Sequence, residues 1–141
     1  MNSIYIDTNI FLDLFDKSSS SSSSTRSFFE SLHSHSIERY TSAETIQEIV
    51  YVAKKRNQLK KGIKIAEIAI KMVRELLPIS KAVIEQYLLD SLIHTSSDSR
   101  DVIHLSAAKA NEIKTIITYD KGFKKFKEIR ALTPAEFLAL V

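Results

Sequence analysis

Short apolar runs and longer amphipathic stretches alternate along the chain. The short runs hold β-branched and aromatic residues without polar alternation, as in Ile4-Tyr5-Ile6 and Ile116-Ile117, which is typical of strands buried on both faces. We therefore predict strands over residues 3–6, 37–41, 77–80, 115–118 and 129–132.

Between these runs the apolar residues recur at the spacing of helices. Ser42 stands at the N-cap of one predicted helix, Pro78 ends another, and Pro134 lies in the first turn of the last, where proline is favoured. The predicted helices cover residues 9–15, 26–33, 43–56, 62–76, 81–93, 100–111 and 134–140, with a short one around 123.

The tract from Ser18 to Ser24 is the one low-complexity stretch of the chain. Serine-rich segments behave as flexible linkers, so we predict a loop that leads into the helix near residues 26–33. The tract shows no catalytic pattern, and its role is open.

Strands that alternate with helices favour parallel pairing, with helices on both faces of the sheet. Only two glycines and two prolines are present, which is sparse for an all-β protein with many tight turns. We predict an α/β fold, a three-layer α/β/α sandwich, as a single domain over residues 1–141. In such sheets ligands bind beyond the carboxyl ends of the strands, where the strand order reverses.

Composition narrows the class of protein. The hydrophobic fraction of 44% and the charged fraction of 26% are those of an ordinary globular protein. The absence of cysteine excludes disulfides, zinc–thiolate sites and thiol nucleophiles, and it favours a reducing compartment. No apolar run reaches the roughly 18 residues of a transmembrane helix, and the N-terminus lacks the pattern of a signal peptide. We expect a soluble, cytoplasmic protein with no membrane partner.

The net charge is only +3, but the basic residues are concentrated in two blocks. Such clusters suit a phosphate backbone, although charge runs more often only solvate a helix surface. The first block holds Lys54, Lys55, Arg56, Lys60, Lys61 and Lys64, and the second holds Lys121, Lys124, Lys125 and Lys127. The blocks alone do not decide between these two roles.

Two aspartates follow predicted strands. Asp7 comes directly after residues 3–6, and Asp120 comes after residues 115–118, so both are expected at the carboxyl edge of the sheet. Each alone has an ordinary explanation, because Asp7 suits a helix cap and Asp120 suits a turn before Gly122. The repeated placement favours a shared site if these two strands are neighbours.

Glu48 lies inside a predicted helix and points away from its main apolar stripe, which favours exposure to solvent. However, Tyr51 and Val52 follow at helical spacing, so this side of the helix is partly apolar. A carboxylate in such surroundings needs a partner, and a metal ion would serve.

Asp101 lies in the first turn of the predicted helix that begins near Arg100. One alternative is that Asp98 and Asp101 together cap the helix; the other is that Asp98 or Ser99 caps it while Asp101 faces the cleft. We expect His104, one turn further on, to pack or form hydrogen bonds rather than to bind a metal.

The candidate catalytic and metal-binding residues are Asp7, Glu48, Asp101 and Asp120. Carboxylates gathered around one cleft repel one another unless a cation neutralises them. Oxygen ligands without cysteine or a histidine pair suit Mg²⁺ or Mn²⁺ better than zinc. Such a metal can activate water and stabilise an in-line displacement at a phosphodiester.

The order of these motifs resembles that of the PIN-domain nucleases. The resemblance is carried by residues 4–9 (IYIDTN), 40–42 with 46–49 (YTS, IQEI), 100–108 (RDVIHLSAA), 117–123 (ITYDKGF) and 132–138 (LTPAEFL). It implies a five-stranded parallel sheet with the first and fourth strands adjacent, and a Mg²⁺- or Mn²⁺-dependent endoribonuclease. It assigns the four candidate acids to the metal site, and Asn9 and Thr118 to its support.

The resemblance also implies partners. Single-domain PIN proteins of this size are commonly toxins of the VapC type, which cut RNA, are neutralised by a small antitoxin and act as homodimers. The serine tract departs from the usual pattern of the family. The RNA that is cut and the number of metal ions are not determined by these residues.

Other functions fit less well. A receiver domain would need an aspartate after the third strand, and a haloacid-dehalogenase-like phosphatase would need one where the chain has Asn9. A non-catalytic RNA- or protein-binding module is the main alternative, although such a module would be expected to lose one or more of the acids. DNA flap cleavage usually requires long insertions, for which 141 residues leave little room.

Overall fold

The computed structural model describes residues 1–141, and its centre is a five-stranded, all-parallel sheet with the order β3-β2-β1-β4-β5. The strands are β1 (Ser3–Ile6), β2 (Glu38–Ser42), β3 (Glu75–Leu77), β4 (Thr115–Ile117) and β5 (Arg130–Leu132). The predicted α/β class and the adjacency of the first and fourth strands are confirmed. Because the order reverses between β1 and β4, the carboxyl ends of these two strands border the crevice where such sheets bind ligands.

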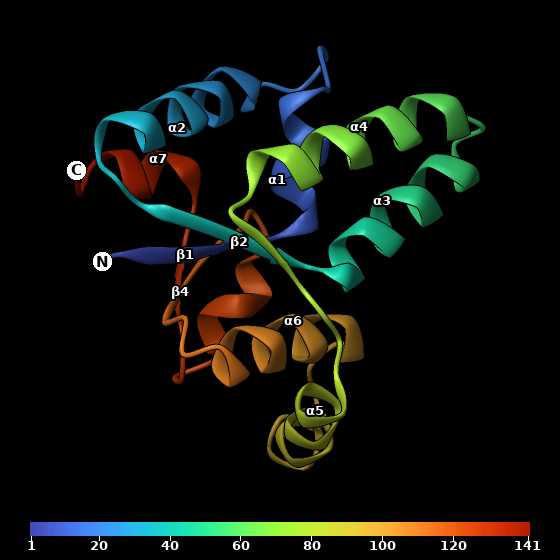
Figure 1. The fold of residues 1–141 in the computed structure, drawn as a ribbon, viewed down its shortest axis with the longest axis vertical. Helices are drawn as coiled ribbons and strands as arrows, with labels where there is room; N and C mark the ends of the chain where they lie inside the picture. Colours follow the sequence, from blue (N-terminus) through green and yellow to red (C-terminus); the bar gives the residue numbers. More distant parts are fainter.

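Helices cover both faces of the sheet, as Figure 1 shows. One face is covered by α1 (Thr8–Leu14), α2 (Ser22–Ser34), α3 (Ala43–Lys55), α4 (Leu59–Met72) and α7 (Pro134–Leu138). The other face is covered by α5 (Lys81–Ile93), α6 (Ser99–Ala110) and the 3-10 helix η1 (Lys121–Lys125). None of these helices is long and apolar enough to cross a membrane.

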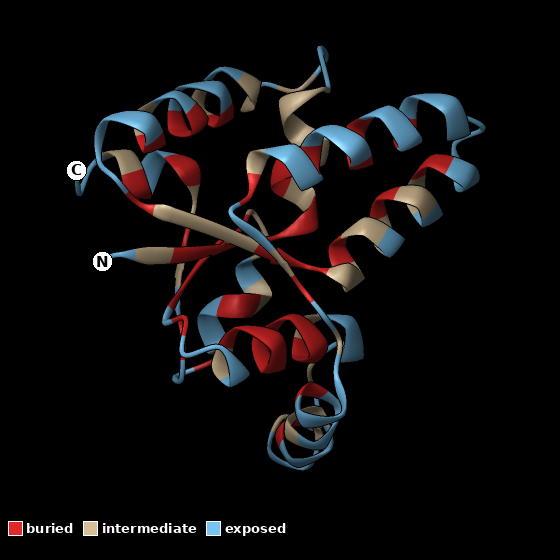
Figure 2. Cartoon of the chain, in the orientation of Figure 1, coloured by how far each residue is buried: buried red, intermediate tan, exposed pale blue.

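Strand β1 supplies both halves of the core. Ile4 and Ile6 pack with α1, α2 and α4, whereas Tyr5 packs with α6 on the opposite face. All three side chains are fully buried, and Figure 2 shows β1 and β4 as buried segments between the two helical layers. The lack of polar alternation in the sequence therefore follows from helices on both sides of the sheet.

The serine tract is more ordered than predicted, because α2 begins inside it at Ser22. Asp13 on α1 accepts hydrogen bonds from the hydroxyls of Ser19, Ser21 (2.7 Å) and Thr25 (2.6 Å). The prediction of a flexible loop up to residue 24 was wrong because one carboxylate from a neighbouring helix binds three hydroxyls of this segment.

The boundary between α4 and β3 also differs from the prediction, which continued the helix to Leu76 and placed the strand at 77–80. In the structure β3 pairs with β2 in parallel, with Thr41 opposite Leu76, and the Arg74 amide donates to the Arg39 carbonyl at 2.8 Å. Leu76 fits the helical spacing equally well. Pairing with β2, which local spacing cannot report, decides its conformation.

Helices α3 and α4 form a hairpin that extends away from the sheet in Figure 1. Gly62 on α4 lies against Ala53 on α3, and a Cβ atom at residue 62 would overlap the Cβ atom of Ala53. The turn between the helices is made with Asn57 in the left-handed backbone region (φ 53°). The absence of a side chain at Gly62 therefore sets the close approach of the two helices.

The substitution Gly62→Ala is expected to lower the free energy of unfolding by about 1–3 kcal/mol, because the added methyl group clashes with Ala53 on the facing helix. Ala53→Gly alone should cost about 1 kcal/mol through helix propensity. The double variant should lose clearly less free energy of unfolding than the sum of the two single losses, because Ala53→Gly leaves room for the methyl group at residue 62. Urea unfolding of the four proteins measures this coupling, and strictly additive losses would show that the contact does not set the spacing.

Candidate active site

Asp7 occupies the carboxyl end of β1, where its amide donates to the Ile117 carbonyl of β4 at 3.0 Å. It is also the N-cap of α1, and its Oδ1 accepts a hydrogen bond from the Thr8 amide at 2.7 Å. The sequence left a helix cap and a cleft residue as alternatives. Asp7 fills both positions, because the strand end and the helix start coincide.

A hydrogen-bond network joins Asp7 to β4. Thr118 Oγ1 donates to Asp7 Oδ2 at 2.7 Å, and Asn9 Nδ2 donates to the same oxygen at 3.0 Å. Asn9 Oδ1 in turn accepts from the Tyr119 amide at 3.0 Å, and Thr118 Oγ1 accepts from the Asp120 amide at 2.9 Å. Asn9 and Thr118 thus tie the first and last of the candidate acids into one unit.

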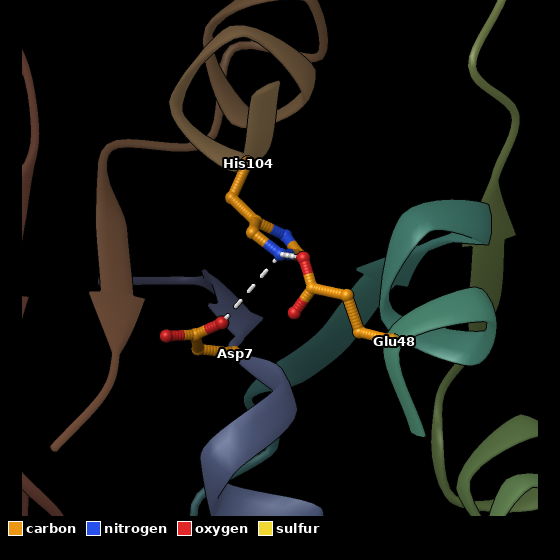
Figure 3. Close-up of side chains that lie close together, drawn as sticks. All are labelled: Asp7, Glu48 and His104. Atoms are coloured by element: carbon orange, nitrogen blue, oxygen red, sulfur yellow. Dashed lines mark hydrogen bonds and ion pairs between the residues drawn. The ribbon is translucent and has the colours of Figure 1, made fainter. Parts of the chain in front are cut away.

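Glu48 is not exposed to solvent, contrary to the direction of its helical phase. Its side chain is 16% exposed, and its Oε1 accepts a hydrogen bond from His104 Nε2 at 2.8 Å. The same nitrogen lies 3.7 Å from Asp7 Oδ1, so the histidine stands between two of the candidate acids, as Figure 3 shows. Ligand atoms of Asp7, Glu48 and His104 all lie within 4.8 Å of one another.

A buried hydroxyl chain holds His104 from behind. The Tyr5 hydroxyl lies 2.6 Å from His104 Nδ1 and 2.7 Å from Ser42 Oγ. Ser42 does take the N-cap position of α3, as predicted, but its side chain makes no capping bond because it contacts Tyr5 instead. His104 forms hydrogen bonds, as expected from the sequence, and its partner is one of the candidate site residues.

Asp98 and Asp101 take different roles. Asp98 is the N-cap of α6 and accepts a hydrogen bond from the Arg100 amide at 2.8 Å, so Asp101 is released from capping. Asp120 Oδ1 accepts from the Gly122 amide at 2.8 Å. A Cβ atom at residue 122 would lie 3.0 Å from Asp120 Oδ1 and 3.5 Å from Asp101 Oδ2, so both carboxylates converge on this glycine.

All four candidate acids line one cleft of about 350 Å³ at the end of the sheet where β1 and β4 stop. They form two pairs, Asp7 with Glu48 around His104, and Asp101 with Asp120. The other residues of the cleft wall are Thr8, Asn9, Leu12, Val52, Asp98, Arg100 and His104.

The pKa values of these groups show how closely the charges are gathered. Burial raises the pKa of Asp7, against the opposing effect of the positive charge on His104. Burial also raises the pKa of Asp101 to about 7, and the negative charge of Asp120 adds to the effect. Burial likewise works to raise the pKa of Glu48, but the hydrogen bond and the positive charge of His104, together with smaller effects of Thr8 and Arg100, outweigh burial and hold that pKa below the ordinary value.

The donor chemistry of the cleft fits a hard divalent cation. Four carboxylates supply oxygen ligands of the type that Mg²⁺ and Mn²⁺ prefer. Thr8 Oγ1 is buried in the cleft wall without a partner at normal hydrogen-bond geometry, although it lies close enough to Glu48 to lower the pKa of that carboxyl. A hydrated cation would supply the missing partner as well as the missing positive charge.

Sequence reasoning did not single out Thr8, Tyr5 or Gly122 as parts of the site. Thr8 and Tyr5 are direct neighbours of Asp7 and Ile6 in the first motif, so their position in that motif was a usable signal. Gly122 follows Asp120 in a predicted turn, and its contact with two carboxylates depends on how α6 meets η1.

Comparison with known proteins agrees with the fold. The family model described as PIN domain matches residues 4–129, a range that includes all four acids, and the chain belongs to this family. One curated relative is ribonuclease VapC13 of Mycobacterium tuberculosis. It is 30% identical over 132 residues, which cover 92% of this chain and 98% of that protein.

Solved structures share the arrangement of the elements. VapBC2 of Rickettsia felis, solved bound to a DNA fragment from their promoter, aligns with a TM-score of 0.76 at 17% identity, over 93% of this chain and 98% of that chain. VapC20 of Mycobacterium tuberculosis, described as a sarcin-ricin loop cleaving toxin, aligns with a TM-score of 0.72 at 16% identity, over 90% and 98% of the two chains. At these identities the likeness is one of fold.

The raised pKa of Asp101 generates a prediction about pH and stability. The folded protein holds this proton up to a pKa of about 7, above the ordinary value of 3.8, so the stabilising contribution is complete near pH 4 and is lost as the pH rises to 7. In chelator-treated buffer, the melting temperature of the wild type should therefore fall more between these pH values than that of Asp101→Asn. Asp98→Asn is the matched control, because the pKa of Asp98 is lowered, chiefly by its hydrogen bond from the Arg100 backbone. An equal dependence of melting temperature on pH in the wild type and in Asp101→Asn would show that burial and the charge of Asp120 do not raise the pKa of Asp101.

The hydroxyl chain behind His104 generates a second prediction. Tyr5→Phe leaves His104 Nδ1 and Ser42 Oγ without their buried partner, and it should lower the free energy of unfolding by about 1–3 kcal/mol. Ser42→Ala removes only the hydrogen bond between Tyr5 and Ser42 and should lower the free energy of unfolding by less. Denaturant unfolding of both variants distinguishes the two, and an equal or larger loss for Ser42→Ala would contradict the role given to the Tyr5–His104 bond.

Proposed function

We propose that this chain is a Mg²⁺- or Mn²⁺-dependent endoribonuclease that hydrolyses phosphodiester bonds of RNA. The observation that carries the proposal is the gathering of Asp7, Glu48, Asp101 and Asp120 in one cleft at the carboxyl ends of the strands. Membership of the PIN-domain family and similarity to a curated ribonuclease support the activity and the choice of RNA.

In this proposal the four carboxylates hold the cation. A divalent cation bound there would activate water and stabilise the negative charge that develops at the scissile phosphate. Asn9 and Thr118 fix the orientation of the Asp7 side chain by donating hydrogen bonds to its Oδ2. His104 keeps Glu48 turned toward Asp7 instead of toward solvent.

Asp101 and Asp120 supply the remaining charge. Asp98 caps α6, so Asp101 is not needed as the cap and lines the cleft. Its pKa of about 7 means that Asp101 binds a proton readily near neutral pH when no cation is present. Cation and proton would therefore compete for this carboxylate.

We further propose that the chain acts as a toxin with a small antitoxin as partner, and that it forms a homodimer. The Rickettsia felis relative was solved as a VapBC complex, which supports the first part. Exposed apolar side chains on α5, typical of surfaces that contact another protein, support a protein partner: Ile84, Leu88, Leu89, Leu92 and Ile93. We propose that this activity takes place in the cytoplasm.

Cleavage of mixed cellular RNA by the purified protein tests the proposed function. With Mg²⁺ or Mn²⁺ we expect cleavage that is lost in chelator. Asp7→Asn and Asp101→Asn should each lower the rate roughly 100-fold or more, the scale of removing one electrostatic group from a catalytic site.

Asp98→Asn is the matched control for these variants, because asparagine can also cap a helix and Asp98 is not one of the four proposed ligands. It should retain activity within a few-fold of the wild type. Equal cleavage by wild type and Asp7→Asn would identify a contaminating nuclease and contradict the proposal. Absence of cleavage with RNA binding intact would favour a non-catalytic binding module.

A further inference from the structure

The first basic block lies at the outer end of the α3–α4 hairpin. Lys54 and Lys55 end α3, Arg56 is its C-cap, and Lys60 and Lys61 lie in the first turn of α4. All five side chains are exposed. The sequence left two roles open for these residues, a solvated helix surface and a site for a phosphate backbone. Their position relative to the acidic cleft bears on this choice.

A second hollow, of about 260 Å³, adjoins the acidic cleft between α1 and the hairpin. The two hollows share Leu12 of α1 and Val52 of α3 as a common wall. On the side away from the acids, the second hollow is lined by Arg56 and Lys61. The second hollow, with Arg56 and Lys61 in its lining, therefore lies next to the acidic cleft.

A third hollow continues along the tip of the hairpin. It shares Gln58 and Lys61 with the second hollow and adds Lys54 and Lys60 to the lining. We call the second and third hollows together the basic groove. The groove extends from the tip of the hairpin to Leu12 and Val52, the two side chains that also line the acidic cleft.

The charge of the basic groove is only partly offset by the protein. Lys54, Arg56, Lys60 and Lys61 take part in none of the salt bridges of the structure. The one acid that lines the groove is Asp16, whose Oδ1 accepts hydrogen bonds from the Ser18 amide at 3.0 Å and the Ser18 hydroxyl at 2.7 Å. These hydrogen bonds lower the pKa of Asp16, and the positive charges of Lys61 and Arg56 contribute less to the same effect. The groove thus keeps an excess of positive charge.

The floor of the groove is apolar. Phe15 and Ile65 line it together with Leu12, which continues into the acidic cleft. An aromatic and aliphatic floor below a row of cations suits a single nucleic-acid strand, because bases stack on aromatic rings while phosphates contact lysine and arginine. The second basic block is less suited, since Lys124 is already paired with Glu136 at 2.9 Å.

We propose that the basic groove binds the phosphate backbone of the RNA on one side of the bond that is cleaved, and leads the strand from the hairpin tip into the acidic cleft. This inference rests on the proposed function. A cleft with four carboxylates repels an anionic strand, so cations next to the cleft are needed to hold the strand in place. An acidic protein segment matches the charge of the groove but has no reason to continue into the carboxylates, whereas the scissile phosphate has to reach them.

The test compares two double variants that remove the same total charge. Arg56→Gln/Lys61→Gln neutralises the groove, and Lys71→Gln/Lys114→Gln neutralises two exposed lysines outside it. Both are made in the Asp101→Asn background, so that a fluorescein-labelled single-stranded RNA of mixed sequence is not cut. Binding is measured by fluorescence anisotropy as a function of salt concentration.

We expect the groove variant to bind this RNA at least roughly 10-fold more weakly at low salt. The slope of log K against log salt concentration should fall by about 1.4, since each lost contact to a single strand contributes about 0.7. The control variant should keep the slope of the parent. Equal losses in both variants would show that only net charge matters and would overturn the inference.

The same substitutions in the active protein separate this inference from the proposed function. If the wild type cleaves RNA, the groove variant should have a raised KM with little change in kcat, and unaltered affinity for Mn²⁺. Cleavage by the wild type with an unchanged KM in the groove variant would overturn the inference alone. Absence of metal-dependent cleavage by the wild type would overturn the proposed function. Unchanged RNA binding with lost binding of an acidic protein would assign the groove to a protein partner instead.

Discussion

One buried residue, Asp7, holds the carboxyl end of the sheet together through both its backbone and its carboxylate. Its backbone amide joins β1 to β4, its Oδ1 caps α1, and its Oδ2 accepts hydrogen bonds from Asn9 and Thr118. A side chain that is only 6% exposed keeps its charge only where such donors and a neighbouring cation stabilise it. The end of the sheet is therefore built around holding this charge in place, and the other acids are added to it.

Positive charge is distributed around this centre at three levels. His104 lies between Asp7 and Glu48, the proposed cation would lie among the four acids, and the basic groove lies outside the cleft. Each of these positive charges offsets the repulsion between neighbouring negative charges, which otherwise lowers stability. In the proposed function, a cluster that lowers stability in the absence of metal would be retained because it would bind the metal, an example of the conflict between stability and activity.

The sequence predicted elements well where the signal is local and less well where a distant segment decides. The buried strand β1, the N-cap position of Ser42 and the proline in the first turn of α7 have the predicted positions. The start of α2 was missed because Asp13, from another helix, binds the serine hydroxyls. Strand β3 was misplaced because its pairing with β2 outweighs the helical spacing of Leu76. In both cases the deciding contact is absent from the window in which a local pattern is read.

Local patterns in the sequence were enough to predict the α/β class and to place Asp7 and Asp120 after strands, whereas Glu48 and Asp101 were assigned through the order of motifs that resembles the PIN-domain nucleases. Contacts between distant elements turn Glu48 toward His104, let Asp98 cap α6 in place of Asp101, and put the first basic block in the hollow next to the cleft. Helical phase gives the direction of a side chain only relative to its own helix. What that side chain meets depends on the packing of α3, α4 and α6 around the end of the sheet.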